Sequence, residues 1–172
     1  MATHSFTILR TLGMVLMVVA LAYSWLQLTN NPGNFHLIMA VNLVFHEAGH
    51  VFLYPFGHYL YVLGGTLFEI GIPLVVTSVF LRQGSYAGAT FAFWWLATAL
   101  YSVSVYVADA PIQALPLLTG DPDSHDWAFL LGATGLLPYA SNLAQLFLLG
   151  SYVSLVLGLY CSYRGLTTVP KS

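Results

Sequence analysis

One short segment of the chain has residue types and spacing suited to a catalytic metal: His46-Glu47-Ala48-Gly49-His50. In a helix, His46 and His50 are four positions apart, share one face and can direct both imidazoles at a single ion. Zinc accepts two histidine nitrogens readily, and a catalytic zinc site needs one more protein ligand and an open position. We therefore expect His46 and His50 to bind one zinc ion per chain, with Glu47 as the general base that deprotonates the attacking water.

Four residues compete for the third ligand position, and the sequence leaves the choice open. Asp126 and His125 rank first, because they are adjacent at a predicted helix start. A His-Asp pair can supply one ligand and an outer hydrogen-bond acceptor, although aspartate at a helix start is also a common cap.

The other two candidates lie on predicted spans. Asp109 ranks next, because it ends a polar stripe with Ser102 and Tyr106 on one helical face. Glu69 ranks last. It follows His50 at a spacing close to that of soluble zinc proteases with a glutamate third ligand, but Pro55 and a double glycine interrupt the path between them.

Composition identifies the class of protein. Of the 172 residues, 58% are hydrophobic and 6% charged, with a mean hydropathy of +0.79. Soluble domains are about a quarter charged, so a free water-soluble domain is excluded. Four Lys and Arg residues in total exclude a nucleic-acid-binding face, and the apolar content excludes disorder. The single cysteine, Cys161, excludes an internal disulfide. We expect one integral membrane domain over residues 1–172, with the lipid bilayer as its main partner.

Hydrophobic runs predict the fold. A membrane helix needs about 20 apolar residues, and five runs qualify or nearly qualify: 8–28, 35–54, 66–81, 86–109 and 139–163. A short piece at 58–63 is predicted to end at Gly64-Gly65. Residues 110–125 read as a polar loop, 126–137 as a half-length re-entrant or interfacial helix, and 164–172 as a polar tail. The prediction is an all-α polytopic bundle of five full spans plus a half-length helix.

Alternating spans would bring the polar residues together. If each span reverses the chain, the N-terminus, the His46–His50 segment, Asp109 and the loop 110–125 share one side of the membrane. All six acidic residues, including Asp121 and Asp123, then lie towards that side. Hydrophobicity alone does not require this asymmetry, and one polar site near that side explains it.

An HExxH segment inside a membrane span, followed by a break and another span, resembles the site-2-protease-like intramembrane zinc metalloproteases. The resemblance implies hydrolysis of peptide bonds in or near the bilayer, with a membrane protein or peptide as substrate. It carries over to His46, Glu47 and His50. In that family a later Asn-Pro stretch ending in Leu-Asp-Gly completes the zinc site, whereas residues 120–127 here read Gly-Asp-Pro-Asp-Ser-His-Asp-Trp. We expect an integral protein of a bacterial inner (plasma) membrane.

Two other functions use the same residues. One is a different metal-dependent membrane hydrolase, which acts on a lipid or another amide with the same ion and water. The other is a non-catalytic metal-binding membrane protein or a transporter, which predicts four protein ligands or metal movement across the membrane. A substrate screen separates the first alternative from a protease, and metal coordination and transport assays separate the second.

Overall fold

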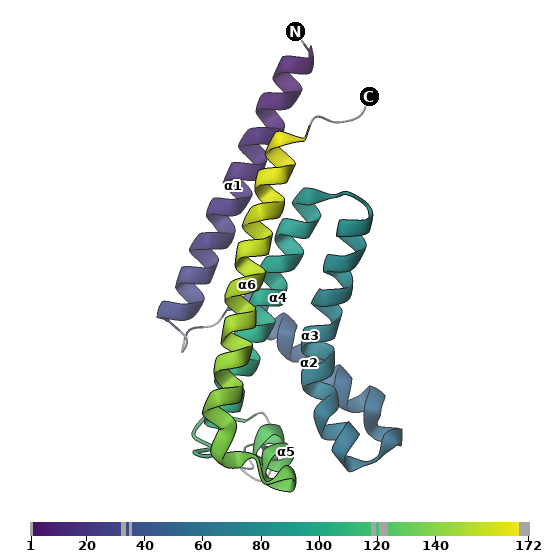
Figure 1. Cartoon of the computed structure of the whole chain (residues 1–172), viewed down its shortest axis with the longest axis vertical. Coiled ribbons are helices and arrows are strands. Elements are labelled where there is room, and N and C mark those ends of the chain that lie inside the picture. Colours follow the sequence, from purple (N-terminus) through teal and green to yellow (C-terminus); the bar gives the residue numbers. More distant parts are fainter. Residues whose placement is uncertain (1, 32–33, 35, 118–119, 121–123, 169–172) are drawn as a thin grey trace.

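The computed structural model describes residues 2–31, 34, 36–117, 120 and 124–168, and these residues form six α-helices (Figure 1). Short 3-10 turns precede α3 and α6, at Tyr54–Phe56 and Leu137–Tyr139. The helices are α1 (Ala2–Asn30), α2 (Leu37–Leu53), α3 (His58–Arg82), α4 (Tyr86–Asp109), α5 (Asp126–Thr134) and α6 (Ala140–Thr167).

Five segments are long and apolar enough to cross a membrane: Ile8–Asn30, Leu37–Phe56, His58–Arg82, Tyr86–Asp109 and Leu137–Thr167. The nine-residue helix α5 is too short to do so. The prediction of an all-α fold with five helices able to span a membrane, plus a half-length helix, is confirmed. A helix satisfies its own backbone hydrogen bonds, which is why such apolar runs become helices in a bilayer.

Helix α4 lies at the centre of the bundle and packs most extensively against α6. Small residues are fully buried along α4, among them Ala92, Ala97 and Ala99, none of which has exposed surface. Small side chains let helices approach closely where lipid provides no hydrophobic driving force. Ser151 of α6 adds a hydrogen bond between the two helices, since its hydroxyl donates to the Ala97 carbonyl oxygen at 2.8 Å.

A cluster of buried apolar residues packs α5 against α3, α4 and α6. Its buried members are Val62, Val103, Val107, Ala110, Trp127, Leu130, Leu131, Ala140 and Ala144. The Trp127 indole nitrogen also donates to Thr66 Oγ1 of α3 at 3.1 Å. The cluster therefore holds the start of α5, and with it Asp126, against the bundle.

The predicted break at Gly64-Gly65 is wrong, because α3 runs through both residues from His58 to Arg82. The glycines allow a close approach to α2. A Cβ built on Gly49 would lie 2.0 Å from the Gly64 carbonyl oxygen, and one built on Gly64 would lie 2.4 Å from the Gly49 carbonyl oxygen. In this context glycine serves helix packing, and the intact backbone hydrogen bonds continue the helix.

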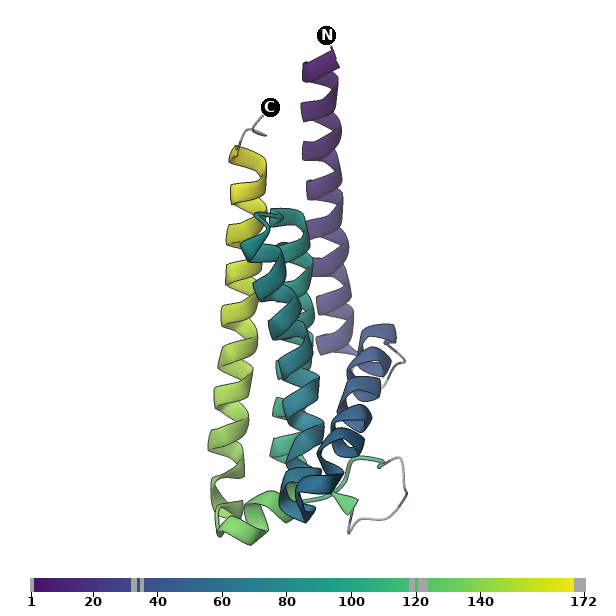
Figure 2. The ribbon, with the colours of Figure 1, turned by 90° about the vertical axis from the view of Figure 1, so that its right-hand side faces the viewer.

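The predicted position of the N-terminus is also wrong. Helices α1 and α2 run in the same direction, and the N-terminus lies at the end of the bundle opposite to α5 (Figures 1 and 2). Arg10 donates to the Gly165 and Thr168 carbonyl oxygens, the latter at 2.7 Å, which fixes the start of α1 beside the end of α6. The turn residues after Asn30 therefore do not reverse the chain. Asp121 and Asp123 lie outside the described residues.

The three described cations lie together at the end remote from α5, which we call the arginine end. Arg10 bonds to the end of α6, and the Arg164 guanidinium lies 5.7 Å from the ring centre of Tyr86, the first residue of α4. Arg82 ends α3 on the same side (Figure 1). Lysine and arginine are enriched in cytoplasmic loops. We therefore expect the arginine end to face the cytoplasm and Asp109, at the opposite end of α4 from Tyr86, to face the other side.

Cysteine labelling tests this orientation. In a Cys161→Ser background, the Ile112→Cys variant is expected to react with an impermeant maleimide added to intact cells, because Ile112 is 76% exposed beyond the end of α4. The matched Gln83→Cys variant places its thiol in the exposed α3–α4 connection and is expected to react only after permeabilisation. The reverse pattern would contradict the assignment.

Candidate metal centre

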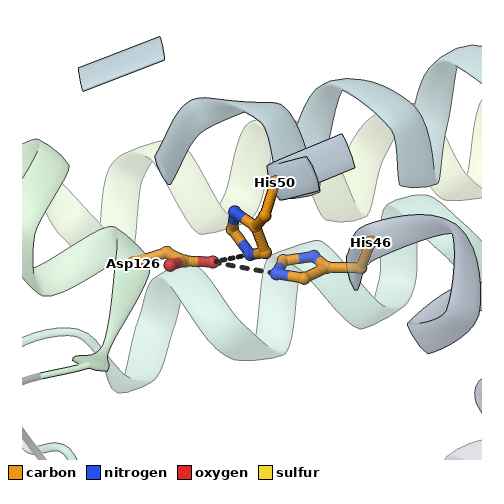
Figure 3. Close-up of side chains that lie close together, drawn as sticks. All are labelled: His46, His50 and Asp126. Carbon is orange, nitrogen blue, oxygen red and sulfur yellow. Dashed lines mark hydrogen bonds and ion pairs between the residues drawn. The ribbon is translucent and has the colours of Figure 1, made fainter. Parts of the chain in front are cut away.

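Three buried side chains bring one ligand atom each to a common point (Figure 3). His46 Nε2 lies 2.8 Å and His50 Nε2 3.3 Å from the same oxygen, Asp126 Oδ2. All three ligand atoms lie within 4.8 Å of one another. The three residues are 6–9% exposed, so few water molecules compete with a bound ion.

The histidines come from one helix and the aspartate from a distant one. His46 and His50 share the buried face of α2, on consecutive turns. Asp126 is the first residue of α5, whose N-cap is His125; the His125 Nδ1 atom accepts the Ala128 N–H at 3.3 Å. The Asp126 N–H donates to the Tyr106 hydroxyl at 3.1 Å, which links α5 to α4.

The outer nitrogen of each imidazole is already bonded. His46 Nδ1 lies 3.0 Å from Glu69 Oε2 of α3, and His50 Nδ1 donates to the Tyr61 carbonyl oxygen at 2.8 Å. Such bonds place the ring proton on Nδ1 and leave Nε2 as the ligand atom, the usual arrangement around histidine metal ligands. Both Nε2 atoms therefore point at Asp126 with lone pairs.

This donor set fits a cation. Two unprotonated imidazole nitrogens and a carboxylate oxygen are all acceptors, so they repel one another unless a proton or a metal ion lies between them. Ligand atoms in a tetrahedral zinc site are about 3.4 Å apart, as follows from metal–ligand distances of about 2.1 Å. The His50–Asp126 separation of 3.3 Å matches this value. The His46–Asp126 separation of 2.8 Å needs to widen by about 0.6 Å on that geometry.

Asp126 has the charge that a metal ligand requires. Burial by itself would raise its pKa, but when no metal ion is bound and protons lie on the histidine Nε2 atoms, the hydrogen bonds from His46 and His50 outweigh this effect and lower the pKa of Asp126. A metal ligand must be deprotonated to bind. Asp126 is therefore a carboxylate at neutral pH.

The other candidates for the third ligand lie elsewhere. Glu69 is 4% exposed and bonds to the outer nitrogen of His46. His125 Nε2 faces Asp109 Oδ2 at 3.3 Å, and the two oxygens of Asp109 also accept the backbone N–H groups of Ala114 and Leu115, each at 3.0 Å. Among the described residues, the only group of three or more potential ligands is His46, His50 and Asp126.

A cavity of about 610 Å³ opens onto this group. His50 and Asp126 line it, together with the exposed side chain of Glu47. Glu47 therefore lies in the accessible wall of the site, whereas His46 and Glu69 lie behind it. Apolar side chains from α2, α4 and the chain after α4 form much of the remaining wall, among them Met39, Leu43, Val105, Leu115 and Leu117.

Two residues of the site were not predicted from the sequence. A Cβ built on Gly65 would lie 2.5 Å from His46 Nε2, so this glycine provides the space for the ring. Tyr106 belongs to the polar stripe that ends at Asp109, but its contact with the backbone of Asp126 depends on α5 folding back against α4. No local pattern encodes either contact.

Comparisons with known proteins give no family assignment. No family model, no curated protein and no solved structure matches the chain. The function is therefore inferred from the side chains of the site and from the cavity that reaches them.

The Glu69→Gln variant is expected to bind zinc about 10–100-fold more weakly, because loss of an outer carboxylate partner of a metal-binding histidine has this effect. Titration of the metal-free protein with zinc against a competing chelator measures the change. Glu47→Gln is the matched control, since it also removes one negative charge from the site but contacts neither imidazole through a described hydrogen bond. Equal weakening in both variants would indicate a general charge effect and contradict the orienting role of Glu69.

Proposed function

We propose that the protein is a membrane-embedded, zinc-dependent metalloprotease that hydrolyses peptide bonds in or near the bilayer. One observation carries the proposal: three ligand atoms from His46, His50 and Asp126 converge beside a cavity whose wall includes Glu47. A catalytic zinc site has three protein ligands and an accessible fourth position. Sites that only store or stabilise a metal are closed by a fourth protein ligand.

Each of these side chains has a distinct role. His46, His50 and Asp126 hold the ion, and Glu69 and the Tyr61 carbonyl orient the two imidazoles. A divalent ion at this position supplies a Lewis acid that polarises a carbonyl group and lowers the pKa of water. Glu47 accepts the proton of the attacking water and returns it to the leaving amine.

The cavity wall supports a peptide as substrate in preference to a phospholipid. A phosphate group is bound through arginine or lysine side chains, and the described wall contains neither. The three described arginines lie at the other end of the bundle. An uncharged amide flanked by apolar side chains needs no such partner, and the volume of about 610 Å³ suits a short segment of chain.

Metal content and hydrolysis, measured on the same sample, test the proposal. Protein purified in lipid nanodiscs is expected to hold about one zinc per chain, to cleave an apolar peptide library and to lose both properties in His50→Ala. The His58→Ala variant is the matched control, because His58 lines the same cavity but is not part of the ligand group.

Two outcomes would contradict the proposal. Wild-type protein that binds no zinc under conditions where it remains folded would remove the metal site. Zinc-loaded protein that carries zinc into liposomes and cleaves no peptide would identify a transporter instead.

A further inference from the structure

We propose that Tyr106 is a catalytic residue that donates a hydrogen bond from its hydroxyl to the substrate carbonyl oxygen as negative charge develops there. The inference deepens the proposed function and rests on it. It assigns a task to a side chain that neither holds the ion nor acts as the base. Three observations carry it: the fixed position of the ring, the bond already made by the hydroxyl, and the cavity on which the residue opens.

The Tyr106 ring contacts the rings of two histidines, His125 and His46. Its ring centre lies 4.2 Å from that of His125, with 26° between the planes, so the two rings are stacked. Its edge contact with His46 has a centre-to-centre distance of 6.0 Å and an angle of 65°. Tyr106 is thus packed directly against one ligand histidine and against the N-cap residue that precedes Asp126.

The proton of the Tyr106 hydroxyl makes no hydrogen bond to any described residue. A phenol group can accept a hydrogen bond and donate one. The Tyr106 oxygen accepts the backbone N–H of Asp126 at 3.1 Å, and this bond uses only its acceptor capacity. The same bond fixes the oxygen beside the residue that supplies the third ligand atom. The donor capacity therefore remains for a group that enters the site.

The cavity brings such a group to Tyr106. Tyr106 lines the same cavity as Glu47, His50 and Asp126. A carbonyl that is attacked by water beside Glu47 must develop negative charge close to these residues. A hydrogen-bond donor that is in place before the reaction stabilises that charge without reorganisation, and removal of one such donor costs about 10²–10³-fold in kcat.

His125, which stacks on Tyr106, and Asp109, which faces His125, keep the Tyr106 hydroxyl in position. His125 is 1% exposed, caps α5 through Nδ1 and faces Asp109 through Nε2 at 3.3 Å. Asp109 in turn holds the backbone of Ala114 and Leu115. The stacked pair of Tyr106 and His125 is therefore fixed both by α4 and by the chain that leads into α5.

A purely structural role would give a different signature. If Tyr106 served only to hold Asp126 through the N–H bond, its hydroxyl would matter for metal affinity and not for a ligand that reaches the ion. The Tyr106→Phe variant keeps the stacked ring and removes only the hydroxyl. Metal affinity and ligand affinity must therefore be measured separately.

The experiment uses cobalt-loaded protein and acetohydroxamate, a chelator that places a carbonyl oxygen beside the metal. Visible absorption reports cobalt binding and then acetohydroxamate binding in the same cuvette. At saturating cobalt, we expect acetohydroxamate to bind about 10-fold more weakly to Tyr106→Phe than to wild type, the effect of losing one hydrogen bond to a charged oxygen. Any change in cobalt affinity, which follows from loss of the acceptor of the Asp126 N–H, is measured separately. Tyr101→Phe is the matched control. Tyr101 also lines the cavity, but its ring packs on Trp25 at 5.5 Å, and both affinities are expected to stay at the wild-type values.

Each other outcome overturns a defined claim. Equal acetohydroxamate affinity in Tyr106→Phe and wild type overturns the donor role of Tyr106, as does a loss of cobalt affinity that accounts for the whole change. Wild-type protein that is folded but binds no cobalt overturns the proposed function, and the assignment of Tyr106 with it. Thermal unfolding of each metal-free variant checks that the bundle is intact.

Discussion

The Glu47→Gln variant is expected to retain its zinc and to lose hydrolysis by about 10²–10⁴-fold, the contribution of a positioned general base. Glutamine has the same shape as glutamate but cannot accept the proton of the attacking water. Glu47 is exposed in the cavity wall, whereas the ligand atoms come from His46, His50 and Asp126. The effect should therefore fall on the chemical step and leave the ion in place.

Zinc content and peptide cleavage, measured on the same preparation, check this result. The informative comparison is Asp126→Asn, which removes the charge of the third ligand and is expected to lose zinc together with hydrolysis. If Glu47→Gln cleaved peptide at the wild-type rate with a full complement of zinc, another group would be the base. If it lost zinc, Glu47 would belong to the ligand set.

The Gly65→Ala variant is expected to weaken metal binding strongly, although Gly65 is not a ligand. The added Cβ would lie 2.5 Å from His46 Nε2 and 2.7 Å from His46 Cε1, well inside van der Waals contact. Moving the α3 backbone away from α2 would give up the close packing of Gly64 against Gly49. The imidazole must therefore turn away from Asp126. We expect zinc affinity to fall by more than the roughly 10–100-fold that follows loss of an outer hydrogen bond.

Gly71→Ala is the matched control for this substitution. Gly71 lies in the same helix, and a Cβ built there meets nothing within 4 Å. Both variants make the same change of residue in α3, so a difference in zinc affinity between them reports the space around His46. Wild-type zinc affinity in Gly65→Ala, with an intact thermal transition, would show that the His46 ring does not occupy this position when zinc is bound.

Local patterns were sufficient for the five candidate spans and for two of the three residues of the ligand group. The apolar runs predicted the five candidate spans, and the 126–137 run predicted a half-length helix, observed as Asp126–Thr134. The spacing of His46 and His50 predicted a shared helical face, because four residues make about one turn. Both inferences depend only on neighbours in the chain, which is why they needed no tertiary information.

The third ligand could not be chosen in this way. Asp126, His125, Asp109 and Glu69 all have suitable chemistry. The structure places Asp126 and Glu69 against His46, and it pairs His125 with Asp109. Asp126 reaches the histidines because Trp127 and its apolar neighbours fasten α5 against α3, α4 and α6. That choice follows from packing between segments about 80 positions apart in sequence.

The direction of α1 and the role of Gly64-Gly65 were likewise decided by contacts between helices. A double glycine reads as a break when only its own segment is considered, but against Gly49 and His46 it is the surface that lets α2 approach α3. The sequence by itself determined a helical membrane protein with a paired-histidine motif, since hydropathy and helical period are local properties. Only the tertiary structure decided which carboxylate meets the histidines and at which end of the bundle the N-terminus lies. Both depend on how whole helices pack.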